Sequence, residues 1–207
     1  MKNRSPIFTI GHSTHTIERF IELLQQHSVT ALADVRSSPF SRYNPQFNRD
    51  VLKRKLRAHG IKYVFLGREL GARSDDPSCY EDGRVQYGRL ALTALFREGL
   101  DRLTRGLNRF RIALMCAEKE PLACHRTLLV ANALVERSLE VVHILADGSL
   151  EPHDKTMARL LDLVGLPQQD LFRTRSELIE EARTLQEARV AYVDEDLAAA
   201  AKGVAVR

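Results

Sequence analysis

One stretch of the chain, M-C-A-E-K-E-P-L-A-C-H-R, gathers side chains that could do chemistry. Cys116 and Cys124 offer thiols that could act as nucleophiles or metal ligands. Glu118 and His125 could transfer protons near neutral pH. Arg126 could hold a carboxylate or phosphate through two parallel hydrogen bonds. We expect Cys124, His125 and Arg126 to open a helix. Free backbone N–H groups and the helix dipole at such a position favour an anion and lower the pKa of a thiol.

The same residues have less specific interpretations. Cysteine is among the most often buried residue types, so Cys116 could be a packing residue, and Cys124 with His125 could cap and pack a helix. Cys79, in a long loop, has no expected role. A zinc or iron site completed by His12 is a further alternative, although Cys-x7-Cys-His lacks the paired short spacings of a structural zinc site. We therefore assign no metal ligand and leave the cofactor unknown, since no common nucleotide-cofactor motif is present.

Residues 36–47 form a second polar cluster, in a loop that contains two prolines. Its hydrogen-bond donors could bind a phosphate or the edge of a base, and an aromatic ring could stack on that base. The candidates are Arg36, Ser37, Arg42 and Asn44, with Tyr43 or Phe47 as the stacking ring. The alternative is a loop that docks on the protein through Phe40 and Phe47.

Positive charge is concentrated in the same part of the chain. Residues 36–73 contain ten basic and two acidic side chains, a net charge of +8 within a chain whose total is +4. Such a concentration indicates an anionic partner, either a small molecule or a nucleic acid. The alternative for Lys53, Arg54, Lys55 and Arg57 is a solvated helix face.

Five short apolar runs predict the strands that must position these side chains. They are residues 7–10, 31–35, 62–66, 111–117 and 140–145. Helices are expected between and after them, over residues 17–24, 48–59, 87–107, 127–135 and 155–164, whereas residues 67–83 read as a long polar loop. This alternation predicts an α/β fold, a three-layer Rossmann-like domain with about five mainly parallel strands and helices on both faces.

The unusual polar residues follow these strands. Ligands of open parallel sheets bind beyond the carboxyl ends of the strands, so we expect one pocket there. It should gather His12, Ser13, Asp34, Arg36, Cys116, Glu118, Cys124, His125 and Arg126. We regard Asp34 as a catalytic candidate with the thiols, Glu118 and His125, and the others as ligand-binding candidates.

The chain divides into an α/β domain over residues 1–166 and a charged helical extension over residues 167–207. The extension is expected to pack on the domain or on a second subunit, which would give a homo-oligomer. Three cysteines cannot close a disulfide framework, so a reducing cytoplasm is expected. No apolar run approaches the roughly 18–20 residues that span a bilayer, and the polar segment Met1–Pro6 does not read as a secretory signal.

Several motifs together resemble a known family. They are T-I-G-H-S, D-V-R-S-S-P, N-P-Q-F, G-I-K-Y-V-F-L-G-R-E-L-G, M-C-A-E-K-E-P-L-A-C-H-R and V-H-I-L-A-D-G. In this order, over residues 7–165, the chain resembles the bacterial and archaeal domain-of-unknown-function family 488 (DUF488). The resemblance implies a compact α/β domain and a site built from these motifs, and it supplies no substrate.

Three functions stay open from the sequence. The first is an enzyme that acts on an anionic, phosphate-bearing, nucleotide or nucleic-acid-derived ligand. The second is a non-catalytic module that binds nucleic acid through its basic segment. The third is a metal-binding or thiol-redox protein.

Overall fold

The computed structural model describes residues 5–204 of the chain. Most of the segment Met1–Pro6 and residues 205–207 of the expected extension lie outside the described residues. Within the described part, a six-stranded sheet has the order β3-β2-β6-β1-β7-β8. The first five strands run parallel and β8 is antiparallel at one edge. The strands are β1 (Ile7–Gly11), β2 (Ala31–Asp34), β3 (Lys62–Phe65), β6 (Ile112–Cys116), β7 (Val141–Ile144) and β8 (Leu150–Pro152).

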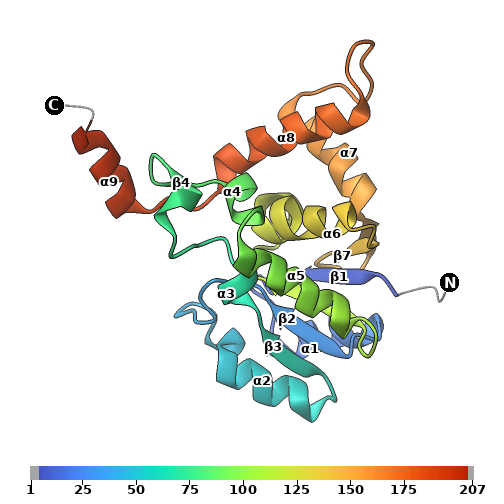
Figure 1. The fold of residues 1–207 in the computed structure, drawn as a ribbon. Coiled ribbons are helices and arrows are strands. Elements are labelled where there is room, and N and C mark those ends of the chain that lie inside the picture. The colour runs from blue at the N-terminus through green and yellow to red at the C-terminus, as the bar shows by residue number, and fades with distance from the viewer. Residues whose placement is uncertain (1–4, 205–207) are drawn as a thin grey trace.

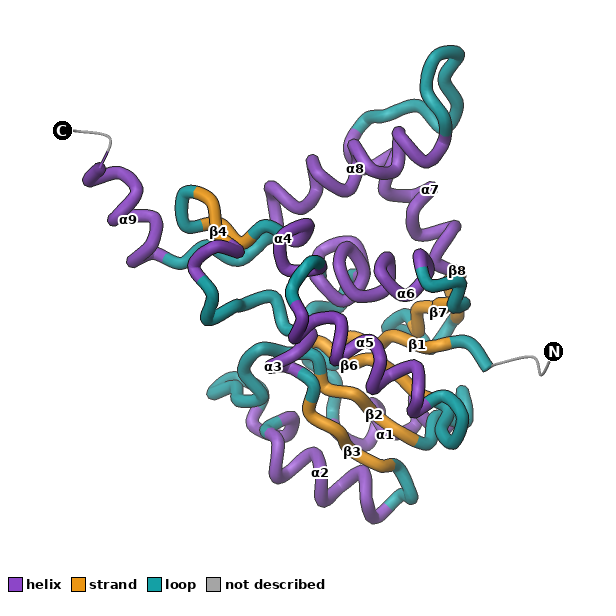
Figure 2. Tube along the Cα trace, viewed as in Figure 1, coloured by secondary structure: helices purple, strands orange, loops and turns teal. Residues whose placement is uncertain are grey.

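Helices cover both faces of the sheet and make three layers (Figure 1). Two helices, α1 (Ile17–Gln26) and α2 (Arg49–Ala58), pack on one face. The helices that cover or extend the other face are α3 (Gly67–Leu70), α4 (Tyr87–Ala91), α5 (Ala94–Gly106), α6 (Asn132–Glu136), α7 (His153–Val164) and α8 (Arg175–Val190). The tube view in Figure 2 shows the strands enclosed between these two groups of helices. The expected α/β, Rossmann-like fold is therefore confirmed.

The sheet has an apolar core on each of its two faces, because side chains of a strand alternate between the faces with a period of two residues. In β1, Phe8 and Ile10 belong to the core shared with α1 and α2, whereas Ile7 belongs to the core on the opposite face. Because alternate side chains point to opposite faces, a strand covered on both sides must be apolar almost throughout. All five residues of β1 are buried, as that rule requires.

Several local predictions were wrong. The single helix expected over residues 87–107 is two helices, because the Thr93 side chain accepts a hydrogen bond from the backbone N–H of Phe96 at 3.2 Å and starts a new helix there. Residues 67–83 are not one loop, since they hold α3 and strand β4 (Tyr80–Glu81), which pairs with β5 (Arg84–Val85). The helix expected over 127–135 is confirmed, and it begins as a π-helix, Arg126–Ala131, before it continues as α6.

Helix α8, in the region after residue 166, packs on the α/β layers. Leu178 and Ala182 of α8 are fully buried in the same apolar core as the sheet. Helix α9 (Glu195–Val204) then projects from the body beside the β4–β5 hairpin (Figure 1). Within residues 5–204, no helix has both the length and the hydrophobicity needed to cross a membrane.

Candidate functional site

A cavity of about 410 Å³ lies at the carboxyl ends of β1, β2 and β6. Its lining comes from six separate regions of the chain, four of which the parallel strands β1, β2, β3 and β6 deliver to one edge of the sheet. The lining residues are His12, Arg36, Ser37, Ser38, Phe40, Ser41, Asn44, Ala72, Arg73, Tyr87, Cys116, Ala117, Glu118, Ala123, Cys124, His125, Val190 and Tyr192. Its volume falls within the range of roughly 300–1,000 Å³ that is usual for small-molecule sites.

Two thiols, an imidazole and a carboxylate form the reactive part of the lining. His125 Nδ1 lies 3.7 Å from Cys116 Sγ and 3.9 Å from Cys124 Sγ. Cys124 Sγ also lies 3.0 Å from Glu118 Oε2, so the thiol and the carboxyl group share a proton. The ligating atoms of both cysteines and His125 all lie within 4.8 Å of one another, a spacing that a metal ion could bridge. This cluster can therefore serve nucleophilic, acid–base or metal chemistry.

The surroundings of the two thiols separate their acidities. Burial raises the pKa of Cys116 well above its ordinary value. Burial acts in the same sense on Cys124, but the Cys116 thiol and the charge of Arg126 outweigh it and bring the pKa of Cys124 well below its ordinary value. Burial and the neighbouring Cys124 raise the pKa of Glu118. Cys124 is thus the more acidic thiol of the pair.

Asp34 and Arg36 form a buried ion pair that builds one wall of the cavity. Arg36 donates from Nε to Asp34 Oδ1 at 2.9 Å and from Nη2 to Oδ2 at 2.7 Å. The Tyr63 hydroxyl donates to the same carboxylate at 2.8 Å. Asp34 is fully buried and does not line the cavity, so its expected catalytic role is not supported and it orients Arg36 instead.

His12 is held in a fixed orientation in the same wall. Its Nδ1–H donates to the Ser13 carbonyl at 2.9 Å, its Nε2 accepts from Arg36 Nη1 at 3.2 Å, and its ring stacks on Phe47 at 4.3 Å. Burial lowers the pKa of His12 to about 4, so the ring is neutral at pH 7. Both ring nitrogens are occupied, and His12 is not among the residues whose ligand atoms cluster, so the structure does not support the metal site completed by His12 that the sequence left open.

Arg126 is fully buried and does not line the cavity, so the expectation that it grips the ligand is wrong. Its Nη1 donates to the Glu118 carbonyl at 2.6 Å and its Nη2 to the Lys119 carbonyl at 3.3 Å. Its backbone N–H points at Cys124 Sγ at 3.4 Å. Arg126 therefore fixes the loop that carries Glu118 and supplies positive charge behind the thiolate.

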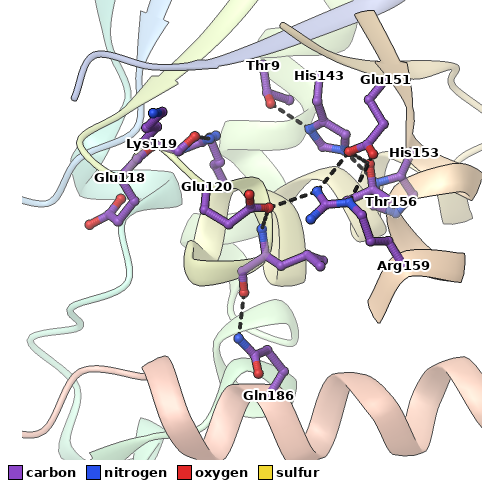
Figure 3. A network of polar contacts seen from close by, with 12 residues as sticks. Thr9, Glu118, Lys119, Glu120, His143, Glu151, His153, Thr156, Arg159 and Gln186 are labelled. Carbon is purple, nitrogen blue, oxygen red and sulfur yellow. Dashed lines mark hydrogen bonds and ion pairs between the residues drawn. The ribbon is translucent and has the colours of Figure 1, made fainter. Parts of the chain in front are cut away.

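The loop that carries Glu118 is also braced from the far side (Figure 3). Glu120 accepts from Arg159 of α7 at 2.8 Å, and Arg159 also binds Glu151 of β8 at 3.0 Å. Gln186 of α8 donates to the Leu122 carbonyl at 2.9 Å. The region beyond residue 166 thus helps to position the reactive cluster.

The structure separates other candidates from the cavity. Ser13 and Arg42 do not line it, and Arg42 lies over the ring of Tyr43, which is 77 % exposed. Phe47 is fully buried and cannot stack on a ligand, whereas Phe40, expected as a docking residue, lines the cavity and is 63 % exposed. Ser37 and Asn44, which the sequence analysis placed in a second cluster, line this cavity too.

Sequence reasoning missed several lining residues. Arg73 was expected at the edge of the sheet, after the third strand, but was not assigned to the pocket; it lies at the cavity over the ring of Tyr192 at 4.2 Å. Tyr87, Val190 and Tyr192 come from regions to which we assigned no site residue. No spacing in the sequence marks them, because only the packing of α4 and the end of α8 brings them to the sheet edge.

The sequence profile of a family described as "Domain of unknown function DUF488" matches residues 16–133. This match contains the segments that hold Arg36, Arg73 and the reactive cluster. No curated protein and no solved structure matches the chain.

Proposed function

The chain belongs to the DUF488 family, and on that premise we propose that the cavity is the active site of an enzyme acting on a small, phosphate-bearing ligand. One observation carries the proposal: the reactive cluster and a cation without an acidic partner line the same cavity. Arg73 is exposed and makes no ion pair within residues 5–204. It is the residue that holds the anion, while Arg36 stays paired to Asp34.

The walls favour a nucleotide over inorganic phosphate. Phe40 exposes most of its ring at the cavity and Tyr192 lies under Arg73. An exposed ring beside a cation is the combination that holds a base and its phosphate at once. Cys124, His125 and Glu118 then supply the thiolate and the proton-transfer groups next to the bound ligand.

Calorimetric titration with inorganic phosphate and with adenosine monophosphate tests the ligand class. Arg73→Gln should weaken both ligands about tenfold or more, since a hydrogen bond to a charged group contributes roughly 1.5–3 kcal/mol. Phe40→Ala should weaken only the nucleotide, because base stacking on an aromatic ring contributes roughly 1–3 kcal/mol. Arg68→Gln, an exposed arginine of α3 outside this cavity, is the matched control and should change neither. Absence of binding, or an equal loss in Arg68→Gln, would overturn the assignment.

Turnover is tested separately by phosphorus NMR on a panel of phosphomonoesters, phosphodiesters and nucleotides. A ligand that the wild-type protein converts should not be converted by the Cys124→Ala or His125→Ala variant. Each variant should still bind that ligand and keep the circular dichroism spectrum of the wild type. Binding without turnover of any panel member would leave a binding protein rather than an enzyme.

A nucleic-acid-binding function is the second candidate, and the surface of α2 favours it. Lys53, Arg54, Lys55 and Arg57 are all exposed on this helix. Anisotropy of a labelled single-stranded oligonucleotide, measured over a salt series, distinguishes the two. A binding module would lose affinity in the triple variant Lys53→Gln, Arg54→Gln, Lys55→Gln and reduce its salt slope by roughly 0.7 for each phosphate that the variant no longer neutralises. It would keep its affinity in Cys124→Ala.

A further inference from the structure

We propose that Cys116, Cys124 and His125 bind one thiophilic divalent metal ion, zinc by its chemistry, with the fourth coordination position facing the cavity. The inference deepens the proposed function by naming a cofactor for the same site, and the purpose of the metal rests on that function. With the metal bound, Cys124 and His125 serve as its ligands, and Glu118 remains the proton-transfer group. Metal binding itself does not depend on any substrate.

The distances within the cluster match tetrahedral zinc coordination. Zinc binds cysteine sulfur at about 2.3 Å and histidine nitrogen at about 2.0–2.1 Å, which puts the S···N edge of a tetrahedron at about 3.6 Å. The two S···N distances in the structure are 3.7 and 3.9 Å. The two sulfur atoms lie no more than 4.8 Å apart, against the S···S edge of about 3.8 Å that tetrahedral zinc requires.

The imidazole is oriented as a metal ligand. His125 Nε2–H donates to the Val35 carbonyl at 3.0 Å, so in the neutral ring Nδ1 carries the free electron pair, and this atom lies 3.7 and 3.9 Å from the two sulfurs. Metal-bound histidines generally donate their second ring N–H to a carbonyl or carboxylate, which fixes the tautomer and the ring plane.

The backbone and a buried cation support the sulfur ligands. The Arg126 N–H points at Cys124 Sγ at 3.4 Å, and its guanidinium lies behind the cluster, fully buried. Two thiolates without a cation between them would repel each other in this apolar setting. A divalent ion removes that repulsion, because it neutralises both charges at once.

The fourth position is open to the cavity. All three proposed ligands line the cavity, and so does Glu118, whose Oε2 lies 3.0 Å from Cys124 Sγ. Three protein ligands with one open position are the arrangement of catalytic rather than structural zinc sites. Glu118 is placed to hydrogen-bond a water or ligand atom in that position.

The test is metal analysis and cobalt substitution on protein purified without an affinity tag. We expect close to one equivalent of zinc by mass spectrometry of the elements. After chelation, Co²⁺ should restore one equivalent of metal with an intense thiolate-to-cobalt charge-transfer band and tetrahedral visible bands. Zinc should then displace the cobalt and remove both sets of bands. Added to the metal-free protein, zinc should raise the melting temperature.

Single variants assign the ligands. Cys116→Ser, Cys124→Ser and His125→Asn should each weaken metal binding by more than the roughly 10- to 100-fold that loss of an outer-shell partner costs. Cys79→Ala is the matched control, since Cys79 is also buried but lies outside the cluster, and its affinity should equal that of the wild type. If a variant does not fold, the cobalt spectrum of the wild-type protein alone decides whether thiolates bind the metal.

The proposal is overturned if wild-type protein gives no thiolate-to-cobalt band, or if Cys79→Ala weakens binding as much as the cluster variants. These results would leave the proposed function standing, because phosphate binding through Arg73 is measured on its own. Conversely, a cobalt band with no phosphate binding would refute the proposed function and keep the metal site.

Discussion

Replacing Asp34 by asparagine should destabilise the protein strongly, although Asp34 does not line the cavity. Its carboxylate is fully buried and accepts hydrogen bonds from Arg36 Nε, Arg36 Nη2 and the Tyr63 hydroxyl. Asp34→Asn removes the negative charge and leaves the guanidinium of Arg36, itself 6 % exposed, without a counter-charge. Loss of one partner of a buried ion pair typically costs about 3–5 kcal/mol.

The assay is urea unfolding at pH 7 followed by circular dichroism. The free energy of unfolding should fall by about 3–5 kcal/mol. In a thermal melt of a chain of this size, the same loss lowers the melting temperature by about 6–20 °C. Tyr63→Phe is the matched control, since it removes one hydrogen bond and leaves the ion pair intact, and it should cost roughly 1–2 kcal/mol.

A double variant separates the charge from the packing. Asp34→Leu combined with Arg36→Met removes both charges, so it should be less destabilised than Asp34→Leu alone. A free energy of unfolding for Asp34→Asn within about 1 kcal/mol of the wild type would refute the reasoning, because that value is typical of a surface pair. It would mean that Arg36 reaches water and is free to bind the ligand directly.

Three further predictions concern other parts of the fold. Burial lowers the pKa of His153 to about 4, against about 6.5 in the unfolded chain. Because the unfolded chain takes up the proton more readily, the free energy of unfolding should fall by roughly 3 kcal/mol as the pH drops from about 6.5 to 4. His153→Phe should reduce this fall when the urea midpoint is measured over the same pH range. Gly11→Ala places a Cβ 1.9 Å from the Glu118 carbonyl oxygen, so the loop must shift, and calorimetry should show weaker phosphate binding with a stability loss of about 1–3 kcal/mol; unchanged binding would contradict the tight packing. Thr174→Ala removes the capping box of α8 and should cost about 1 kcal/mol in urea unfolding without altering phosphate affinity.

The fold was predictable where each strand is covered on both faces. β1, β2, β6 and β7 read as short apolar runs because every residue in them is buried. β8 was missed because it is an edge strand of three residues that ends at a proline, and its pairing with β7 needs few apolar side chains.

The site was predictable in the residues that directly follow strands. Strand ends brought Arg36, Cys116 and Glu118 to one cavity, as their positions in the sequence indicated. The burial of Arg126 was not predictable, because it depends on the loop at Glu118 and Lys119 turning its carbonyl groups inward. Arg73 and Tyr192 meet across a large sequence separation through tertiary packing alone, which leaves no local signal.

Crystals grown with tungstate, an anion that mimics phosphate and scatters anomalously, would locate the bound anion. We expect an anomalous peak inside the cavity, within contact of Arg73 and beside Cys124. A peak found only on the exposed cations of α2, with none in the cavity, would contradict this expectation and favour the nucleic-acid-binding alternative.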